Sequence, residues 1–265
     1  MEVIIQPTAE AASWLVARII ANAIRGNPHS VLGLATGRTM ERLYSRLVSL
    51  HRDEGLDFSL ARAFNLDEYV GISADHPGSY RFYMNRHFYS QINIDVRNTF
   101  LPDGCAADLD AECQRYDGQI HAFGGIDLQL LGIGRSGHIG FNEPLSSIAS
   151  RTRVKALMPV TISENAGAFT NQQEMPRRAI TMGVGTILEC RRLIVLVTGE
   201  PKAEILAKAV EGPITSRVTA SALQMHPRCT VVCDAAAATH LDERPYYDWI
   251  FQNEPEWEPY RRLKE

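Results

Sequence analysis

The chain alternates short apolar runs with longer stretches in which apolar residues recur at helical spacing. Seven of the apolar runs predict β-strands, at residues 3–5, 31–35, 61–66, 127–133, 179–182, 193–197 and 230–233. Near-continuous apolar runs are typical of strands that are buried on both faces of a parallel sheet. Because helical stretches separate these runs, we predict an α/β fold with a doubly wound, mostly parallel, Rossmann-like sheet and helices on both faces.

Helix signals lie between the apolar runs. Thr8 is a candidate N-cap for a first helix, and Asp108 is a candidate cap for a helix over residues 107–123. An aromatic-rich stretch at 79–89 also suits a helix, and Pro201 is placed to open another at its first turn. These signals give each predicted crossover between strands its own helix.

Composition indicates one compact domain. The chain has 265 residues, of which 45% are hydrophobic, enough to bury a large core. It contains no internal repeat, low-complexity tract or linker-like segment, so we predict a single domain over residues 1–265. The net charge of -4 offers no basis for holding a phosphate backbone, and we expect no nucleic-acid partner.

The cysteines and the N-terminus indicate a reduced compartment. Five cysteines without framework spacing argue against a secreted disulfide scaffold, and Cys229 and Cys233 suit core positions in an apolar strand. The N-terminus lacks a signal-peptide pattern, and no apolar run approaches the length of a membrane span. We therefore expect a cytoplasmic protein with no membrane partner.

Three polar clusters follow predicted strands, where ligands of doubly wound folds bind. The first contains Thr36, Gly37, Arg38 and Thr39, between a buried strand and a helix. Free N–H groups at a helix N-terminus, two hydroxyls and a guanidinium would together hold a phosphate. The loop matches neither the P-loop nor the G-x-G-x-x-G pattern, and an ordinary strand-to-helix turn with a threonine cap is the alternative.

The second cluster places Asp67 and Glu68 directly after the third strand. Adjacent residues point in different directions, so one carboxylate can face the crevice while the other pairs with the scaffold. A carboxylate shielded by neighbouring aromatic rings has a raised pKa, which suits a general base for a carbon next to a carbonyl. The alternative is that Asp67 merely caps the next element.

The third cluster, GIGRSGHIGFNEP at residues 132–144, sets His138 among four glycines and places Glu143 five residues later. A neutral imidazole can move a proton to or from a ring oxygen, and Glu143 can orient it. Metal binding by Asp67, His138 and Glu143 is an alternative, but no tight ligand spacing such as H-E-x-x-H is present. We favour a site without a metal or other cofactor.

In this order the clusters resemble the glucosamine-6-phosphate deaminase family, from the strand before Thr36 to about Asp234. The stretches that carry the resemblance are FNLDEYVG at 64–71, HIGFNEP at 138–144 and SRTRVK at 150–155. The resemblance implies conversion of glucosamine 6-phosphate and water into fructose 6-phosphate and ammonia, in amino-sugar catabolism. The resemblance also implies that Asp67 is the base that moves a proton between C2 and C1, and that His138, supported by Glu143, opens the pyranose ring.

The resemblance also implies two phosphate sites. Lys202 resembles a ligand of the substrate phosphate. Ser146, Arg153 and Lys155 resemble an allosteric site for N-acetylglucosamine 6-phosphate, an activator of hexameric members; a structural basic strand is the alternative. Related chains occur as monomers, dimers or hexamers, and we expect a homo-oligomer.

Two positions depart from the family pattern. Ser136 stands where well-studied members carry an aspartate beside the ring-opening histidine, and a serine can still make one hydrogen bond there. Gly167 stands where they carry a phosphate-binding arginine, whereas Arg38 occupies a loop position that is usually small. We hypothesise that Arg38 supplies the guanidinium missing at Gly167.

Three other functions remain open at this stage. A galactosamine-6-phosphate deaminase differs only in the sugar epimer. A 6-phosphogluconolactonase-like hydrolase shares the fold, but its loop continues differently after the histidine. The non-enzymatic alternative is a sugar-phosphate sensor with little turnover, which the changes at Ser136 and Gly167 keep open.

Overall fold

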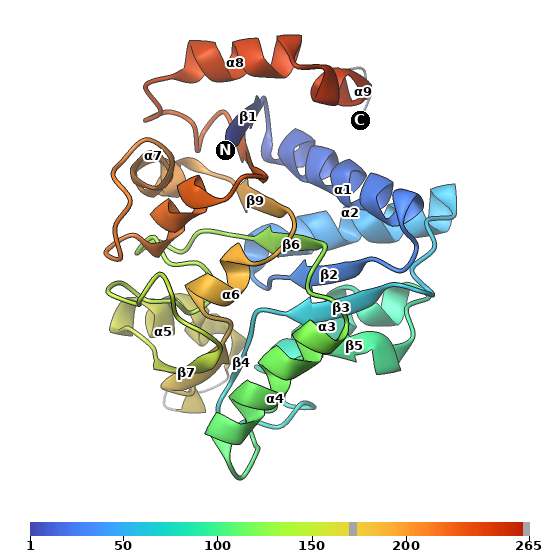
Figure 1. The fold of residues 1–265 in the computed structure, drawn as a ribbon, viewed down its shortest axis with the longest axis vertical. Coiled ribbons are helices and arrows are strands. Elements are labelled where there is room, and N and C mark those ends of the chain that lie inside the picture. The colour runs from blue at the N-terminus through green and yellow to red at the C-terminus, as the bar shows by residue number, and fades with distance from the viewer. Residues whose placement is uncertain (170–173, 262–265) are drawn as a thin grey trace.

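The computed structural model describes residues 1–169 and 174–261 (Figure 1). Its centre is a seven-stranded sheet in the order β1-β10-β9-β6-β2-β3-β5, and every neighbouring pair is parallel. The strands are β1 (Glu2–Gln6), β2 (Val31–Leu34), β3 (Arg62–Asn65), β5 (Thr99–Phe100), β6 (Leu128–Leu131), β9 (Leu193–Val197) and β10 (Cys229–Asp234). The predicted fold class is confirmed.

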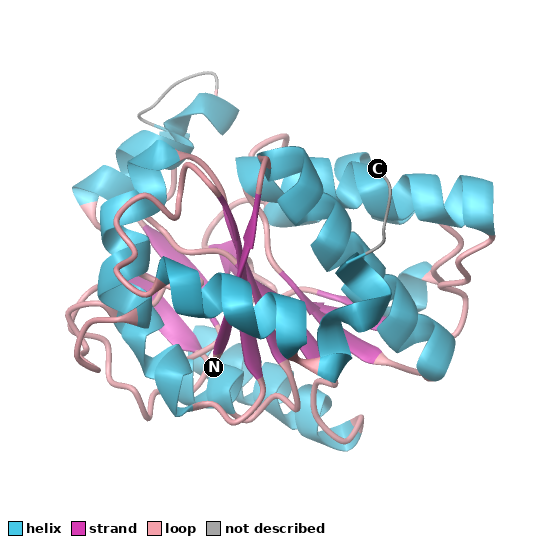
Figure 2. Cartoon of the chain, turned by 90° about the horizontal axis from the view of Figure 1, so that it is seen from above, coloured by secondary structure: helices cyan, strands magenta, loops and turns pink. Residues whose placement is uncertain are grey.

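Helices cover both faces of this sheet (Figures 1 and 2). Figure 1 shows α1 and α2 together on one side, and α6 and α7 on the other. Parallel strands need such crossovers, and their right-handedness decides which face each helix takes. The α-helices that precede β10 in the chain are α1 (Ala9–Gly26), α2 (Arg38–Glu54), α3 (Tyr80–His87), α4 (Leu109–Ala122), α5 (Pro159–Asn165), α6 (Val184–Leu188) and α7 (Ala203–Val210).

The predicted caps are present. The side chain of Thr8 accepts a hydrogen bond from Ala11 N–H at the start of α1, and Asp108 accepts from the N–H groups of Asp110 and Ala111 at the start of α4. Pro201 lies in a 3-10 turn, Glu200–Lys202, that leads into α7. These contacts satisfy N–H groups that have no partner within the helix.

A second, three-stranded antiparallel sheet corrects the sequence prediction. It consists of β4 (Asp67–Tyr69), β8 (Arg178–Thr181) and β7 (Arg153–Ala156), in the order β4-β8-β7. We assigned the run at 179–182 to the parallel sheet, but it pairs outside that sheet and packs on a smaller apolar cluster that includes Tyr69, Phe141 and Phe169. An apolar run reports that a strand is buried, and it does not identify the strand's neighbours.

The C-terminal segment lies along the edge strand β1. Helix α8 (Arg244–Asn253) contacts β1, and α9 (Glu258–Arg261) follows it. Trp257 is fully buried, whereas Tyr246 and Trp249 are each 56% exposed, so the aromatic segment packs only partly on its own domain. Cys229 and Cys233 are buried thiols, as predicted.

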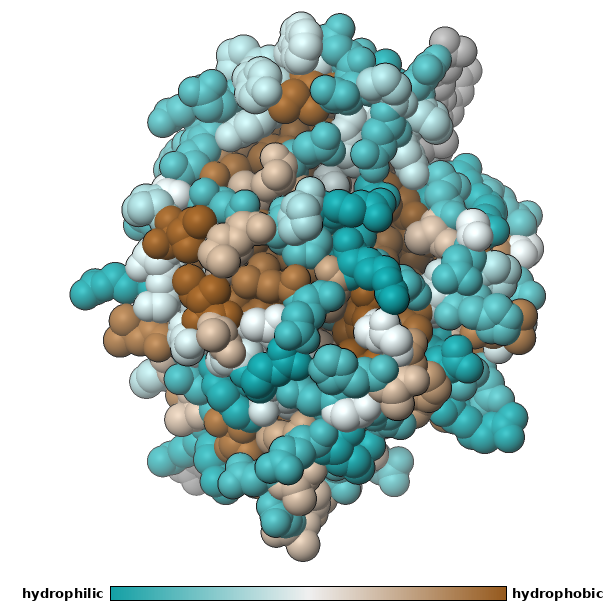
Figure 3. Space-filling view, viewed as in Figure 1, coloured by the Kyte–Doolittle hydropathy of each residue, from teal (hydrophilic) through white to brown (hydrophobic). Residues whose placement is uncertain are grey.

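Most of the face drawn in Figure 3 is polar, and several apolar residues lie side by side left of its centre. Within residues 1–169 and 174–261, no helix combines the length and the apolar character that crossing a membrane requires.

Candidate active site

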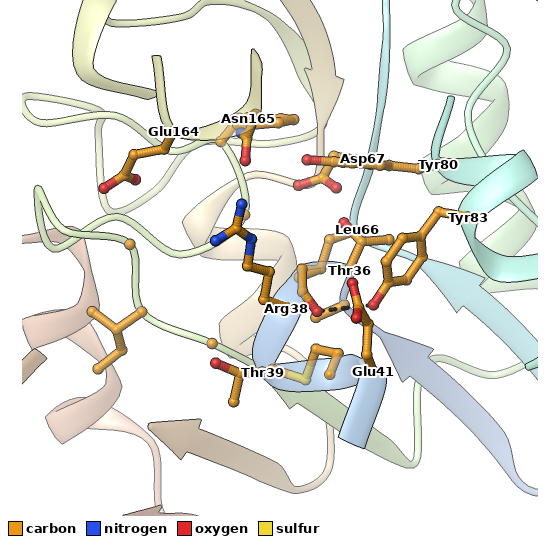
Figure 4. A pocket seen from close by; sticks show the side chains of 18 of the residues that line it. Thr36, Arg38, Thr39, Glu41, Leu66, Asp67, Tyr80, Tyr83, Glu164 and Asn165 are labelled. Atoms are coloured by element: carbon orange, nitrogen blue, oxygen red, sulfur yellow. Dashed lines mark hydrogen bonds between the residues drawn. The ribbon is translucent and has the colours of Figure 1, made fainter. Parts of the chain in front are cut away.

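A pocket of about 700 Å³ lies at the carboxyl ends of the central strands. Its wall includes residues that directly follow β2, β3, β6 and β9, and Figure 4 shows the side chains that point into it. Strands β2 and β6 are neighbours at the point where the chain's progression across the sheet reverses. Doubly wound folds bind ligands at this reversal, because the connecting loops diverge there and leave a crevice.

The two neighbouring carboxylates, Asp67 and Glu68, have different environments. Glu68 accepts hydrogen bonds from the backbone N–H groups of Tyr69, Tyr80 and Arg81, at 2.8, 2.9 and 2.9 Å. It is therefore bound to the first turn of α3, while Asp67 lines the pocket. Asp67 is the first residue of β4. The alternative that Asp67 caps the next element is wrong, because Glu68 is the residue that accepts hydrogen bonds from the N-terminus of α3.

The Asp67 carboxyl is desolvated. The residue is 5% exposed, and within the described residues no hydrogen bond reaches its carboxyl oxygens. Burial first, and then the charge of Glu68, raise the pKa of Asp67 well above its ordinary value. A carboxyl of this kind accepts a proton more readily than a solvated aspartate does.

Gly140 allows the histidine loop to pass beside Asp67. Its φ is +55°, and a Cβ at this position would lie 3.4 Å from Asp67 Oδ2 and 2.9 Å from Thr181 Oγ1. A side chain here would therefore crowd both groups as well as strain the backbone. The glycine brings the 138–144 loop against the carboxyl that follows β3.

His138 is held by two neighbours on one ring nitrogen. Its Nδ1 lies 2.8 Å from Ser136 Oγ and 3.3 Å from Glu143 Oε2. Ser136 Oγ also lies 3.5 Å from Glu143 Oε2, so the serine bridges the pair. Because Nδ1 is engaged, Nε2 is the ring nitrogen available for proton transfer. Gly134 makes room for the ring, since a Cβ there would lie 2.1 Å from Nε2.

Glu143 is fixed as well as buried. Its Oε1 accepts a hydrogen bond of 3.0 Å from Met158 N–H, just before α5. Burial acts to raise the pKa of Glu143, but its contacts with His138 and with Met158 N–H outweigh burial and leave the pKa below its ordinary value. Glu143 therefore carries its charge when the imidazole beside it becomes protonated.

The cationic end of the pocket begins at α2. Gly37, with φ +118°, is the N-cap residue and makes no side-chain cap, so the alternative of a threonine-capped turn does not describe this loop. Tyr83 Oη donates to Gly37 O at 2.8 Å. Thr36, Gly37, Arg38 and Thr39 all line the pocket.

Arg38 reaches across the pocket. Its Nη2 lies 3.8 Å from the point where a Cβ on Gly167 would be, and Figure 4 shows its guanidinium pointing towards Glu164 and Asn165. Lys202 lines the same pocket, and neither Arg38 nor Lys202 forms an ion pair within the described part of the chain. Burial lowers the pKa of Lys202, with the charge of Glu164 opposing this shift and that of Arg135 adding to it.

Sequence reasoning missed two residues at this end. Arg135 Nε lies 2.8 Å from Glu164 Oε1, and both residues line the pocket. Arg135 could have been found, because it follows β6 in the same loop as His138. Glu164 lies near the end of α5, where no local pattern indicates a contact with that loop.

The residues of the expected allosteric site are placed elsewhere. Ser146, Arg153 and Lys155 do not line the 700 Å³ pocket. Arg153 Nη1 donates to Asn142 Oδ1 at 2.9 Å, whereas its Nη2 and Ser146 Oγ are buried without a partner within the described residues. Arg153 and Lys155, two positions apart in β7, point to the same face of their strand.

Over residues 1–169 and 174–261, no group of three or more His, Cys, Asp or Glu side chains is arranged to hold a metal ion. Asp67 and His138 line the pocket, whereas Glu143 is not part of its wall and is engaged with the imidazole of His138. What the pocket offers is a desolvated base, a supported imidazole and a set of cations. This combination suits acid–base chemistry on a small anionic substrate.

Comparison with known proteins gives a consistent family. A family model described as glucosamine-6-phosphate isomerases/6-phosphogluconolactonase matches residues 6–232. A glucosamine-6-phosphate deaminase of Arthrobacter sp. (strain FB24) is 47% identical over 258 residues, covering 97% of this chain and 99% of that protein. A glucosamine-6-phosphate deaminase of Streptomyces coelicolor is 46% identical over 259 residues, covering 97% and 99%.

Solved structures agree with these matches. A structure described as a monomeric glucosamine-6-phosphate deaminase superposes with a TM-score of 0.89 at 46% identity, covering 91% of this chain and 100% of that one. A 6-phosphogluconolactonase from Trypanosoma cruzi superposes with a TM-score of 0.71 at 20% identity, covering 91% and 97%. The second likeness concerns the fold alone.

Proposed function

Because the chain belongs to the family of glucosamine-6-phosphate isomerases and 6-phosphogluconolactonases, we propose that its pocket binds glucosamine 6-phosphate and converts it, with water, into fructose 6-phosphate and ammonia. The resemblance found in the sequence is confirmed by the family model and by full-length relatives at 46–47% identity. Those relatives bear the name of the deaminase and not of the lactonase.

The observation that carries the proposal is the meeting of Asp67 and His138 at one pocket whose other end is cationic. A second carboxylate lies beside each of the two groups and has its own partner. Glu68, next to Asp67, is bound to α3, and Glu143, next to His138, is bound to the N–H of Met158. A desolvated carboxyl suits the removal of a proton from carbon, and a supported imidazole suits transfer between oxygens. Isomerisation of a cyclic amino sugar needs both.

The proposed reaction has three steps. His138 moves a proton between the ring oxygen and O1, which opens the pyranose to an aldehyde. Asp67 then takes the proton from C2 and returns it to C1, while O1 gains a proton and the nitrogen loses one, so that the aldose amine becomes a ketose imine. Water adds to the imine carbon, its oxygen becomes the C2 carbonyl, and its two protons leave with the nitrogen as ammonia.

Ser136 and Glu143 act through His138 in this scheme. Glu143 stabilises the imidazolium that forms when Nε2 accepts a proton, and Ser136 holds the opposite nitrogen in place. Where the family pattern has a second carboxylate, this chain has a neutral hydroxyl at 2.8 Å. We therefore expect ring opening to proceed with one carboxylate beside the imidazole.

Arg38, Lys202 and the loop from Thr36 to Thr39 form the proposed phosphate site. A free helix N-terminus and two cations suit a phosphate dianion. The guanidinium of Arg38 lies next to Gly167, which supports the hypothesis that it replaces the arginine missing there.

The remaining predictions concern regulation, assembly and location. Ser146, Arg153 and Lys155 lie apart from the pocket, and Ser146 Oγ and Arg153 Nη2 are buried without a partner in the described residues, which supports a second anion site of unspecified ligand. A homo-oligomer remains a prediction, and the solved relative at 46% identity is described as monomeric. A cytoplasmic location remains a prediction from the unpaired cysteines.

The test is an assay of purified protein with glucosamine 6-phosphate, in which ammonia and fructose 6-phosphate are measured together. We expect both products in equal amounts. Galactosamine 6-phosphate and 6-phosphogluconolactone are assayed in parallel, because they represent the two other enzymatic functions. Faster turnover of either one would replace the proposed substrate, and binding of sugar phosphates without turnover of any would favour the sensor.

A further inference from the structure

The cationic end of the pocket contains a carboxylate as well as cations. Glu164, near the end of α5, forms an ion pair with Arg135, which follows β6, through a contact of 2.8 Å between Oε1 and Nε. Neither residue is part of the proton-transfer site. Both line the pocket together with Arg38 and Lys202.

The position of Glu164 is unusual for an anion-binding region. Figure 4 shows its carboxylate on the side of Arg38 away from Asp67 and Glu41, and its ion pair is with the cationic side chain of Arg135. The charges of Glu164 and Arg135 both act on Lys202, so these three groups form one electrostatic unit, and Arg38 lines the same pocket. A phosphate entering this unit is attracted by three cations and repelled by one carboxylate.

The exposure of the pair shows how readily it can be exchanged. The Arg135 side chain is 61% exposed and that of Glu164 is 25% exposed. An ion pair this close to solvent is weak, so an incoming dianion can compete for the guanidinium. Glu164 lines the same pocket, so its carboxylate repels an anion bound there.

We propose that Glu164 is an internal counter-ion that occupies Arg135 in the free protein and weakens phosphate binding, so that it sets the affinity of the pocket for phosphorylated ligands. Phosphate binding then exchanges one partner of Arg135 for another. Removal of the carboxylate frees Arg135 and ends the repulsion. Naming the ligand an amino-sugar phosphate rests on the proposed function, whereas the exchange itself requires only a phosphate.

Binding of inorganic phosphate, measured by calorimetry at low salt, tests the proposal without turnover. Glu164→Gln should bind phosphate about two- to fivefold more tightly than the unaltered protein, the range that one solvent-accessible ion pair provides. The gain should shrink as salt is added, because exposed charges are screened. Glu164→Ala repeats the test with another replacement, and a thermal transition checks that each variant folds.

Glu189→Gln is the matched control. Glu189 forms an exposed ion pair with Arg151 at 2.5 Å, and neither residue lines the active-site pocket. The substitution Glu189→Gln changes the net charge of the protein by the same amount as Glu164→Gln and should leave its phosphate affinity unchanged.

A double-mutant cycle adds the second readout. Arg135→Gln should weaken phosphate binding, and the two substitutions together should not be additive, because Glu164 acts partly through Arg135. Unchanged or weaker phosphate binding in the folded Glu164 variants would overturn the proposal.

The result is separable from the proposed function. If the protein turns over glucosamine 6-phosphate but the Glu164 variants bind phosphate as before, the counter-ion fails alone. If the variants bind phosphate more tightly but no substrate is turned over, the counter-ion stands and the assigned reaction fails.

Discussion

The two ends of the pocket differ in burial and in charge. At the proton-transfer end, Asp67, His138 and Glu143 are largely buried, and burial and direct contacts shift the pKa values of the two carboxyls in opposite directions. At the cationic end, Arg38, Arg135 and Lys202 line the cavity, and Glu164 is the carboxylate that pairs with Arg135. Desolvation raises the pKa of the proposed base at the first end, and partial exposure at the second end lets a phosphate bind and dissociate.

This division predicts different kinetic effects. Substitutions at the proton-transfer end should lower kcat, because the groups act on the transition state. Replacing a cation at the other end should mainly raise KM, because the phosphate takes no part in the reaction and is bound in ground state and transition state alike. The predictions below run from the largest expected effect to the smallest.

Asp67→Asn should lower kcat by about a thousandfold or more, since the amide cannot accept the C2 proton. Substrate should still bind, because the cationic end is intact. The check is steady-state kinetics combined with calorimetric binding of glucosamine 6-phosphate. Retained turnover would remove Asp67 from the mechanism.

The same substitution should stabilise the protein at neutral pH. The folded-state pKa of Asp67 is raised, so its contribution to stability is complete below the unfolded pKa and is lost as pH rises through the folded one. Asp67→Asn removes that cost, and a gain of about 1 kcal/mol would raise Tm by about 2–4 °C. In the unaltered enzyme, kcat/KM should fall with decreasing pH as Asp67 is protonated, at a pH above the ordinary range for aspartate.

Glu143→Gln should lower kcat by about a hundredfold, because the imidazolium loses the charge beside it. The amide oxygen can still accept from Met158 N–H, so the loop should keep its conformation. Kinetics with the cyclic substrate measure the effect, and Glu204→Gln, at an exposed position on α7, is the control. Equal activity in the two variants would contradict the role given to Glu143.

Arg38→Ala should raise KM about tenfold, as expected for the loss of one charge-assisted contact to phosphate, and should leave kcat within a few-fold. The measurement is KM together with the affinity for inorganic phosphate, and both should weaken. Unchanged values would show that Arg38 does not replace the arginine missing at Gly167.

Ser136→Ala should have the smallest effect, a loss in kcat of about fivefold, comparable with one neutral hydrogen bond. His138 would keep Glu143 at 3.3 Å as its remaining support. The comparison to make is with Ser136→Asp, which adds the family's usual carboxylate and should equal or exceed the unaltered enzyme. A greater loss for the alanine than for Glu143→Gln would reverse the order of the two supports.

The sequence predicted the parallel sheet and the proton-transfer end because both depend on local patterns. Buried strands are continuous apolar runs; Asp67 directly follows one of them, and His138 lies in the glycine-rich loop after another. The pairing of β4, β7 and β8 could not be predicted, since strands from distant parts of the chain make that sheet. The ion pair of Glu164 with Arg135 was missed for the same reason: it joins two elements whose contact depends on the finished fold.

The division of labour between the two ends is tested most directly by measuring kcat and KM of Asp67→Asn and Arg38→Ala in one coupled assay for ammonia release from glucosamine 6-phosphate. We predict that Asp67→Asn abolishes turnover while substrate binding persists, and that Arg38→Ala raises KM with kcat nearly unchanged. A loss of kcat in Arg38→Ala equal to that in Asp67→Asn, or turnover by Asp67→Asn, would contradict the account.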